Sequence, residues 1–149
     1  MQYLRNTTLI IWDQGLPEED GHYLVTVKKP DGSKVVEVRW YDEDEKSFFR
    51  LNWEEYIAFA RVSESDEAFK KAKAEGMADE IEWRRDEYPD ENEKFVLLFD
   101  WCGDYLAMCP FIEENRDFDG YTLDQIFAWA EIPEPCAADK TIGELMNEE

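Results

Sequence analysis

Carboxylates are the side chains in this sequence that are best placed to do chemistry, because they gather in short runs along the chain. Such runs bind basic proteins or hard cations, and a pair of carboxylates can also serve as acid and base in hydrolysis. We predict that eleven of them bind a partner: Asp42, Glu43, Asp44, Glu45, Asp86, Glu87, Asp90, Glu91, Glu93, Glu113 and Glu114.

Catalytic and metal-binding patterns are not completed by the neighbouring residues. Residues 115–120 resemble the first half of a calcium loop, but Ile126 stands where the bidentate Glu is needed. The single histidine, His22, has no serine and aspartate at a spacing that supports a triad, and no glycine-rich phosphate loop is present. We therefore expect no catalytic residue, no metal and no cofactor. A metal-dependent hydrolase that uses the carboxylates is the alternative.

The charge of the chain favours a basic partner. There are 37 acids against 16 bases, which gives a net charge of −21. A surface of this sign repels nucleic acids and anionic membranes and attracts basic proteins, most strongly at low salt. The competing interpretation is that the acids only keep the protein soluble.

The sequence favours an intracellular protein. The three cysteines fit no usual zinc spacing, which is typical of reduced thiols in the cytoplasm. The N-terminus does not have a basic region followed by an apolar one, and no apolar run approaches the ~20 residues that a membrane span needs. We expect a protein of the bacterial host cytoplasm that binds neither a membrane nor nucleic acid directly.

An internal repeat positions the acids. Residues 57–62 reappear at residues 127–132, and the offset of seventy holds back to residue 34. Further upstream the offset becomes 71 or 72. Trp12 then matches Trp83, and residues 23–27 match residues 95–99.

Apolar runs separated by turn residues predict strands and one hairpin in each repeat. We expect strands at 7–12, 22–28, 34–41, 47–51, 56–62, 95–100, 104–109, 118–123 and 125–132. A helix is expected over 65–76, with Ser65 as its N-cap and Gly76 at its end, and a helical turn over 141–147. Pro110 is expected to end its strand or to mark a sheet edge.

These elements predict an α+β fold of two related antiparallel β units with pseudo-two-fold symmetry, joined by a helix. The whole chain, residues 1–149, would form one compact domain. Its repeats would span about residues 8–62 and 80–135, followed by a tail over 136–149.

The tryptophans divide into two groups. Trp12, Trp83 and Trp129 stand at aromatic positions of the repeat, which predicts a place in the core. Trp40 and Trp53 have no aromatic counterpart. An exposed Trp beside acids would anchor a protein interface, and ordinary packing is the alternative.

The opening and the ending of the chain resemble the phage and prophage domain-of-unknown-function family 551. The resemblance lies in Trp12, Leu16-Pro17-Glu18-Glu19, Gly21, Tyr23-Leu24-Val25 and the closing stretch of residues 128–135 around Trp129 and its Pro-Glu-Pro. The family has a His before that Trp, where this chain has Ala128. The resemblance implies a duplicated phage or mobile-element protein, and it implies no activity.

Together these features predict an acidic binding protein without catalytic activity. We expect a mobile-element inhibitor of bacterial defence, similar to anti-CRISPR and anti-restriction proteins, that imitates DNA and occupies a basic nucleic-acid-binding surface of its target. An immunity protein against a basic toxin nuclease and an accessory phage protein are the alternatives.

Overall fold

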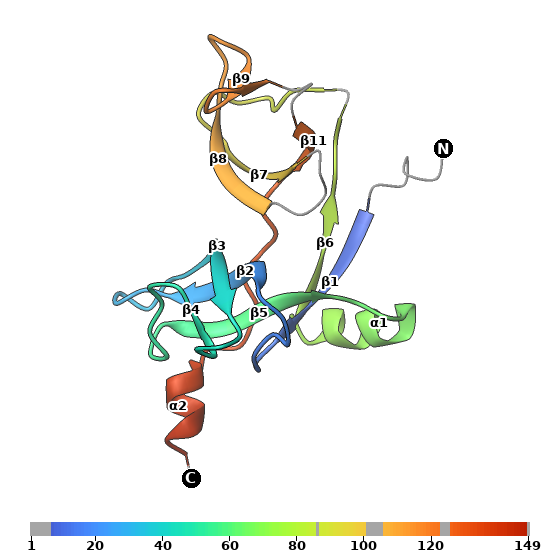
Figure 1. Ribbon diagram of the computed structural model, residues 1–149. Coiled ribbons are helices and arrows are strands. Elements are labelled where there is room, and N and C mark those ends of the chain that lie inside the picture. Colours follow the sequence, from blue (N-terminus) through green and yellow to red (C-terminus); the bar gives the residue numbers. More distant parts are fainter. Residues whose placement is uncertain (1–6, 86, 101–105, 123–125, 149) are drawn as a thin grey trace. The chain divides into compact units, whose positions relative to one another are not determined.

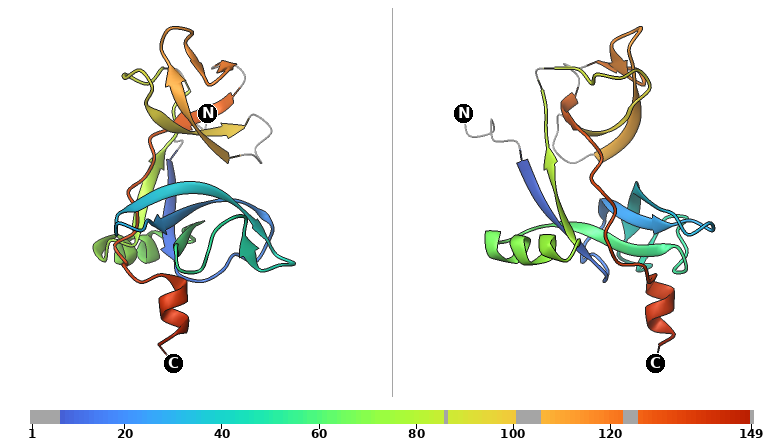
Figure 2. Two further views of the ribbon diagram at one scale, coloured as in Figure 1. Left: turned by 90° about the vertical axis from the view of Figure 1, so that its left-hand side faces the viewer. Right: turned by 180° about the vertical axis from the view of Figure 1, so that it is seen from behind.

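A computed structural model describes residues 7–85, 87–100, 106–122 and 126–148. The protein is mostly β, with 45% strand and 11% helix, in two curled antiparallel sheets with the helix α1 (Asp66–Ala74) between them in the chain. The prediction of two antiparallel β units joined by a helix is therefore confirmed, while their pseudo-two-fold symmetry stays a prediction. Figure 2 shows that neither sheet is flat.

The chain forms two compact units. The major unit holds Leu9–Glu80 and Pro133–Glu149, and the minor unit holds Ile81–Ile132 with the chain up to Thr8. The chain passes from one unit to the other within its first strand, within the strand after α1, and after its last strand.

The larger sheet has six strands, which follow one another in the order β4, β3, β2, β5, β1 and β6. Their bounds are β4 (Ser47–Phe48), β3 (Lys34–Asp42), β2 (Gly21–Lys28), β5 (Tyr56–Val62), β1 (Thr7–Asp13) and β6 (Ala78–Glu82). The inner face of the sheet carries an aromatic and valine core, in which Val25, Val27 and Tyr56 are fully buried.

The smaller sheet has five strands in the order β10, β9, β8, β7 and β11. Their bounds are β10 (Tyr121–Thr122), β9 (Asp117–Phe118), β8 (Leu106–Ile112), β7 (Phe95–Asp100) and β11 (Ile126–Ala130). Val96, Leu98, Phe111, Phe118 and Trp129 form its core.

The strand pairing of one unit recurs in the other. Asp13 pairs with Phe59 in the major unit, and Arg84 exchanges backbone hydrogen bonds of 2.7 and 2.9 Å with Trp129 in the minor unit. Both sheets have a register shift near the start of the strand that contains this aromatic residue. Two further pairs recur. Tyr41 pairs with Phe48 in the major unit as Phe111 pairs with Phe118 in the minor unit. Val25 pairs with Phe59 as Leu98 pairs with Trp129.

The predicted alignment of β2 with β7 is wrong by one residue. Val25 corresponds to Leu98, because each pairs with the equivalent aromatic residue of the neighbouring strand, so the offset here is 73 and not 72. A one-residue slip reverses the two faces of a strand. The extra residue that produces the slip is Glu93, whose left-handed φ of 62° forms a bulge before β7.

Three predicted strands also differ from the structure. The predicted strand 118–123 is interrupted, because Asp119 and Gly120 have left-handed φ values of 53° and 99° between β9 and β10. The strand β8 continues through Pro110 to Ile112, because Phe111 N–H points to the Lys94 carbonyl oxygen at 2.9 Å. The nitrogen of Pro110 therefore points away from β7, where the sheet needs no donor. The predicted strand 47–51 stops at Phe48, since Arg50 has a φ of 54°.

The strand β6 was not predicted, because its acidic sequence does not favour a strand. Its Ile81 and Ala78 are nevertheless buried. Tertiary packing of these two residues therefore outweighs the weak strand propensity of Asp79, Glu80 and Glu82.

Both predicted helices are confirmed. Ser65 caps α1 by accepting a hydrogen bond from the Ala68 amide. Phe69 packs the helix against Ile11 and Ala78, and Figure 1 shows α1 beside β1 and β6. The second helix, α2 (Ile142–Met146), begins with the predicted capping box of Thr141 and Glu144.

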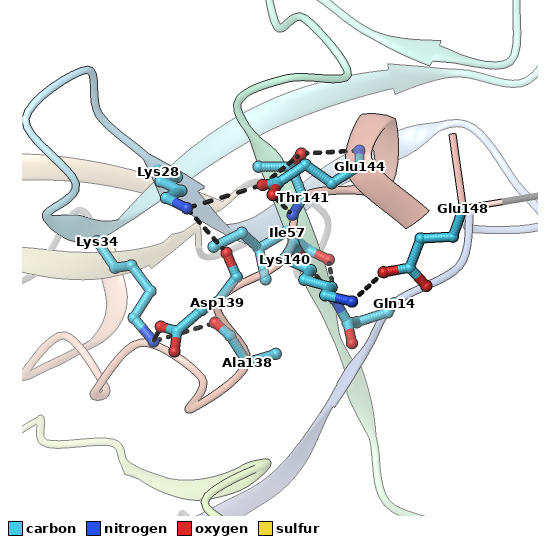
Figure 3. A network of polar contacts seen from close by, with 10 residues as sticks. All are labelled: Gln14, Lys28, Lys34, Ile57, Ala138, Asp139, Lys140, Thr141, Glu144 and Glu148. Atoms are coloured by element: carbon cyan, nitrogen blue, oxygen red, sulfur yellow. Dashed lines mark hydrogen bonds and ion pairs between the residues drawn. The ribbon is translucent and has the colours of Figure 1, made fainter. Parts of the chain in front are cut away.

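Two lysines of the β2–β3 hairpin hold the tail of the major unit (Figure 3). Lys34 Nζ donates to the carbonyl oxygens of Cys136 at 2.9 Å and Ala138 at 3.0 Å, and pairs with Asp139. Lys28 Nζ donates to the Asp139 carbonyl oxygen at 3.1 Å. The ammonium groups of the hairpin thus satisfy three backbone carbonyl oxygens of the tail.

Candidate functional site

The acids of the major unit lie on two neighbouring loops. One loop, residues 18–20, leads into β2, and the other, residues 42–45, joins β3 to β4. Asp20 Oδ1 accepts a hydrogen bond of 2.6 Å from the Glu43 backbone amide, which ties the two loops together. We call these seven acids the major acidic cluster: Glu18, Glu19, Asp20, Asp42, Glu43, Asp44 and Glu45.

The turn of this cluster has a fixed backbone. Asp42 Oδ1 accepts hydrogen bonds from the amides of Asp44 at 2.9 Å and Glu45 at 3.3 Å. Lys46 has a left-handed φ of 51° and pairs its ammonium with Glu43 at 2.6 Å. Asp44 and Glu45 are exposed at the tip of the turn, so their carboxylates face solvent from a rigid support.

The minor unit repeats this arrangement. Asn92 Oδ1 accepts a hydrogen bond of 2.8 Å from the Glu113 amide, as Asp20 does from Glu43. Arg116 has the same left-handed φ as Lys46, at 53°. The acids on these two loops form the minor acidic cluster: Asp90, Glu91, Glu93, Glu113 and Glu114, all of them exposed.

Nine of the eleven predicted acids therefore fall in the two clusters. Glu87 does not, because it pairs with Arg84 at 2.8 Å, while its carbonyl oxygen accepts a hydrogen bond of 2.7 Å from Trp129 Nε1. Asp86 lies outside the described residues. Within the clusters, Asp90 lies 3.7 Å from the Lys94 ammonium.

The carboxylates of the major acidic cluster shift the pKa values of neighbouring side chains. Burial raises the pKa of Tyr41; Lys46 opposes this, and Glu43, Asp20 and Asp42 raise the pKa further. The hydrogen bond to Glu43 raises the pKa of Lys46. The cluster thus stabilises positive charge and disfavours additional negative charge, as a surface for a basic partner requires.

Sequence reasoning missed the acids of residues 18–20. The available signal was the match of Pro17 with Pro89, since both prolines are buried at the start of an acid-bearing loop. The loop is distant from residue 43 in the chain, so its membership in the cluster depends on the pairing of β2 with β3.

The loop clamp can be tested with two matched variants. Asp20→Ala and Asn92→Ala are each expected to speed hydrogen exchange of one amide, that of Glu43 or of Glu113, by roughly fivefold, because a hydrogen bond contributes about 1 kcal/mol. Amide exchange measured by NMR checks this. Acceleration spread over the whole unit would show that the clamp supports the fold and not the loop alone.

Within the described ranges, no three His, Cys, Asp or Glu side chains are grouped to hold a metal ion. A hollow of about 430 Å³ lies between β2 and α2 and is lined by Lys28, Lys29, Pro30, Glu54, Glu55, Thr141 and Glu144. Lys28 and Glu144 approach each other there at 3.7 Å.

None of the helices in the described part of the chain is long and apolar enough to cross a membrane. Comparison of the chain with family models, with curated proteins and with solved structures found no match. The resemblance to the phage family therefore depends on the residues quoted above, and the candidate site depends on the geometry of the two acidic clusters.

Proposed function

We propose that this chain is an acidic, non-catalytic binding protein that occupies the basic nucleic-acid-binding surface of a defence protein. It would act as an inhibitor encoded by a phage or another mobile element in the bacterial cytoplasm. One observation carries the proposal: both units present exposed acids on the same pair of loops, with the same clamp between them.

A basic groove is the natural partner of such loops. Lys and Arg side chains that bind phosphates also bind carboxylates, and bidentate pairs with Arg are the strongest of these contacts. Because the clamps fix the backbone before binding, less conformational entropy is lost when the partner docks. The net charge of −21 would speed the encounter with a basic surface.

Neutralising four exposed acids tests the proposal. The variant Asp44→Asn, Glu45→Gln, Glu113→Gln and Glu114→Gln removes four negative charges and changes the net charge from −21 to −17. We expect it to associate roughly tenfold or more slowly with a basic target at low salt, because steering depends on local potential. Targets are captured from bacterial lysate on the immobilised protein, identified, and measured again in purified form by surface plasmon resonance.

A matched control variant has the same net charge as this four-fold variant. It carries Glu64→Gln, Glu75→Gln, Glu80→Gln and Glu82→Gln, at exposed positions outside both clusters. We expect the control to bind nearly as the unmodified protein does, and duplex DNA to compete with the protein for the target. Equally slow association of both variants with the target would mean that only total charge matters. If duplex DNA does not compete, the proposal that the protein imitates DNA is contradicted.

A further inference from the structure

Three aromatic residues are neighbours where β2, β3 and the end of β4 pair in the larger sheet. His22 and Trp40 are paired across β2 and β3, with ring centroids 5.0 Å apart and ring planes at 70°. Phe49, just after β4, donates its amide to the Trp40 carbonyl oxygen at 2.8 Å. We call His22, Trp40 and Phe49 the aromatic row.

Two residues of the aromatic row are exposed. The exposed fraction is 42% for Trp40 and 61% for Phe49. Their neighbours in the sequence, Tyr41 and Phe48, have exposed fractions of only 1% and 3%. Alternation along the strands places each neighbour on the inner face, where it builds the core. The aromatic row therefore lies on the face opposite the aromatic and valine core, beyond the part of that face where Leu24, Thr26 and Val36 are buried.

Folding of the repeat does not require the aromatic row. In the minor unit, Pro110 and Asp119 occupy the positions that correspond to Trp40 and Phe49. The minor unit nevertheless forms the equivalent hairpin and short strand. The exposure of these large apolar rings in the major unit is thus not explained by the folding of the repeat. Exposed apolar surface beside polar residues is typical of an interaction site.

Arginine fixes the backbone that carries Phe49. Arg39 donates to the carbonyl oxygens of Phe49 at 3.1 Å and Arg50 at 2.9 Å, while Glu37 holds its guanidinium at 2.6 Å. Arg50 lies over the Phe49 ring at 5.1 Å. The backbone that carries Phe49 is therefore held by contacts within the protein itself.

The major acidic cluster adjoins the aromatic row along the chain. Asp42 lies two residues after Trp40 on β3, and the turn 42–46 leads directly into β4 and Phe49. An aromatic and arginine centre with a polar rim is the common composition of protein interfaces. The acids that adjoin the aromatic row along the chain would supply such a rim, and their charge complements lysine and arginine.

We propose that the aromatic row is the anchor of the binding face and inserts into an apolar pocket of a protein whose pocket rim is rich in Lys and Arg. This inference rests on the proposed function, because it names the chemistry of the partner at the same site. It also predicts specificity: a purely polycationic surface without an apolar pocket binds only through the acids.

Defined peptides test the anchor. Two synthetic peptides carry lysines at both ends and differ only in a central Leu-Trp or Ala-Ala pair. Each is titrated at low salt into the full-length ¹⁵N-labelled protein, and NMR follows the indole N–H of Trp40, assigned from its loss in Trp40→Phe. We expect the Leu-Trp peptide to bind at least tenfold more tightly and to shift the Trp40 indole signal.

Variants identify the residues responsible. Trp40→Ala and Phe49→Ala should each remove the preference for the Leu-Trp peptide, with up to roughly 30-fold weaker binding, as is typical of an aromatic hot spot. Tyr121→Ala, which truncates an exposed aromatic ring of the minor unit, should not. Because Phe49 is the more exposed ring, its variant keeps the test valid if Trp40→Ala does not fold.

The outcomes separate the two proposals. Equal binding of both peptides, with shifts confined to the acidic loops, would overturn the anchor and leave the acid-based function in place. An unchanged preference in Phe49→Ala and Trp40→Ala would also overturn the anchor. No binding of either peptide at low salt would overturn the proposed function and the anchor together.

Discussion

Phe118→Ala is expected to lower the free energy of unfolding by about 3–5 kcal/mol, the usual loss for truncating a buried Phe. Its side chain is fully buried, with the rings of Phe111 and Trp129 at centroid distances of 5.3 and 6.4 Å. The minor unit holds few residues, and small units have little stability to lose. We therefore expect its strands to lose protection at 37 °C in hydrogen exchange measured by mass spectrometry.

Phe48→Ala is the matched variant of the major unit, because Phe48 pairs with Tyr41 as Phe118 pairs with Phe111. The loss of protection should then be greatest in β2 and β3. Phe49→Ala is the control: its ring is exposed, so we expect a change below about 0.5 kcal/mol. A similar effect of Phe48→Ala and Phe49→Ala would contradict the assignment of the core to the inner face.

Gly76→Ala is expected to destabilise the major unit by about 2–5 kcal/mol. Gly76 ends α1 with a φ of +77°, which alanine adopts at a cost, and a Cβ there would lie 2.6 Å from the Cβ of Ala137. The Gly76 carbonyl oxygen also accepts a hydrogen bond of 2.9 Å from the Ala137 amide. Denaturant unfolding followed by circular dichroism measures the change.

Gly32→Ala separates the two causes, because Gly32 has a φ of +90° and no atom within 4 Å of an added Cβ. Gly32→Ala should lower the free energy of unfolding only by the cost of the left-handed backbone conformation, about 1–2 kcal/mol. Adding Ala137→Gly to Gly76→Ala should restore the part that comes from the overlap, which a double-mutant cycle isolates. Equal losses in Gly76→Ala and Gly32→Ala would mean that the tail does not press on the end of α1.

Local chemistry explains why much of the fold was predictable. The strands 56–62 and 95–100 were predicted with their observed bounds, because apolar runs and flanking turn residues act within a few positions. The caps of α1 and α2 were also predictable, since Ser65 and Thr141 bond to amides three residues away. Even the tail segment 133–135 carried its own stop signal in two prolines.

Errors arose where non-local geometry overrode a local signal. Pro110 continues a strand because its nitrogen faces away from β7, which depends on the register of the hairpin. The acidic strand β6 forms because Ala78 and Ile81 are buried, and sequence propensity does not contain that packing.

The candidate site shows the same division. The sequence by itself determined the number and sign of the charges, the repeat, and the acid runs at 42–45 and 113–114. Only the tertiary structure brought Asp20 to the Glu43 amide and Asn92 to the Glu113 amide, and only it left Trp40 and Phe49 exposed beside the acids. The physical reason is that charge is a property of each residue, whereas proximity and exposure are set by which strands pair and in which register.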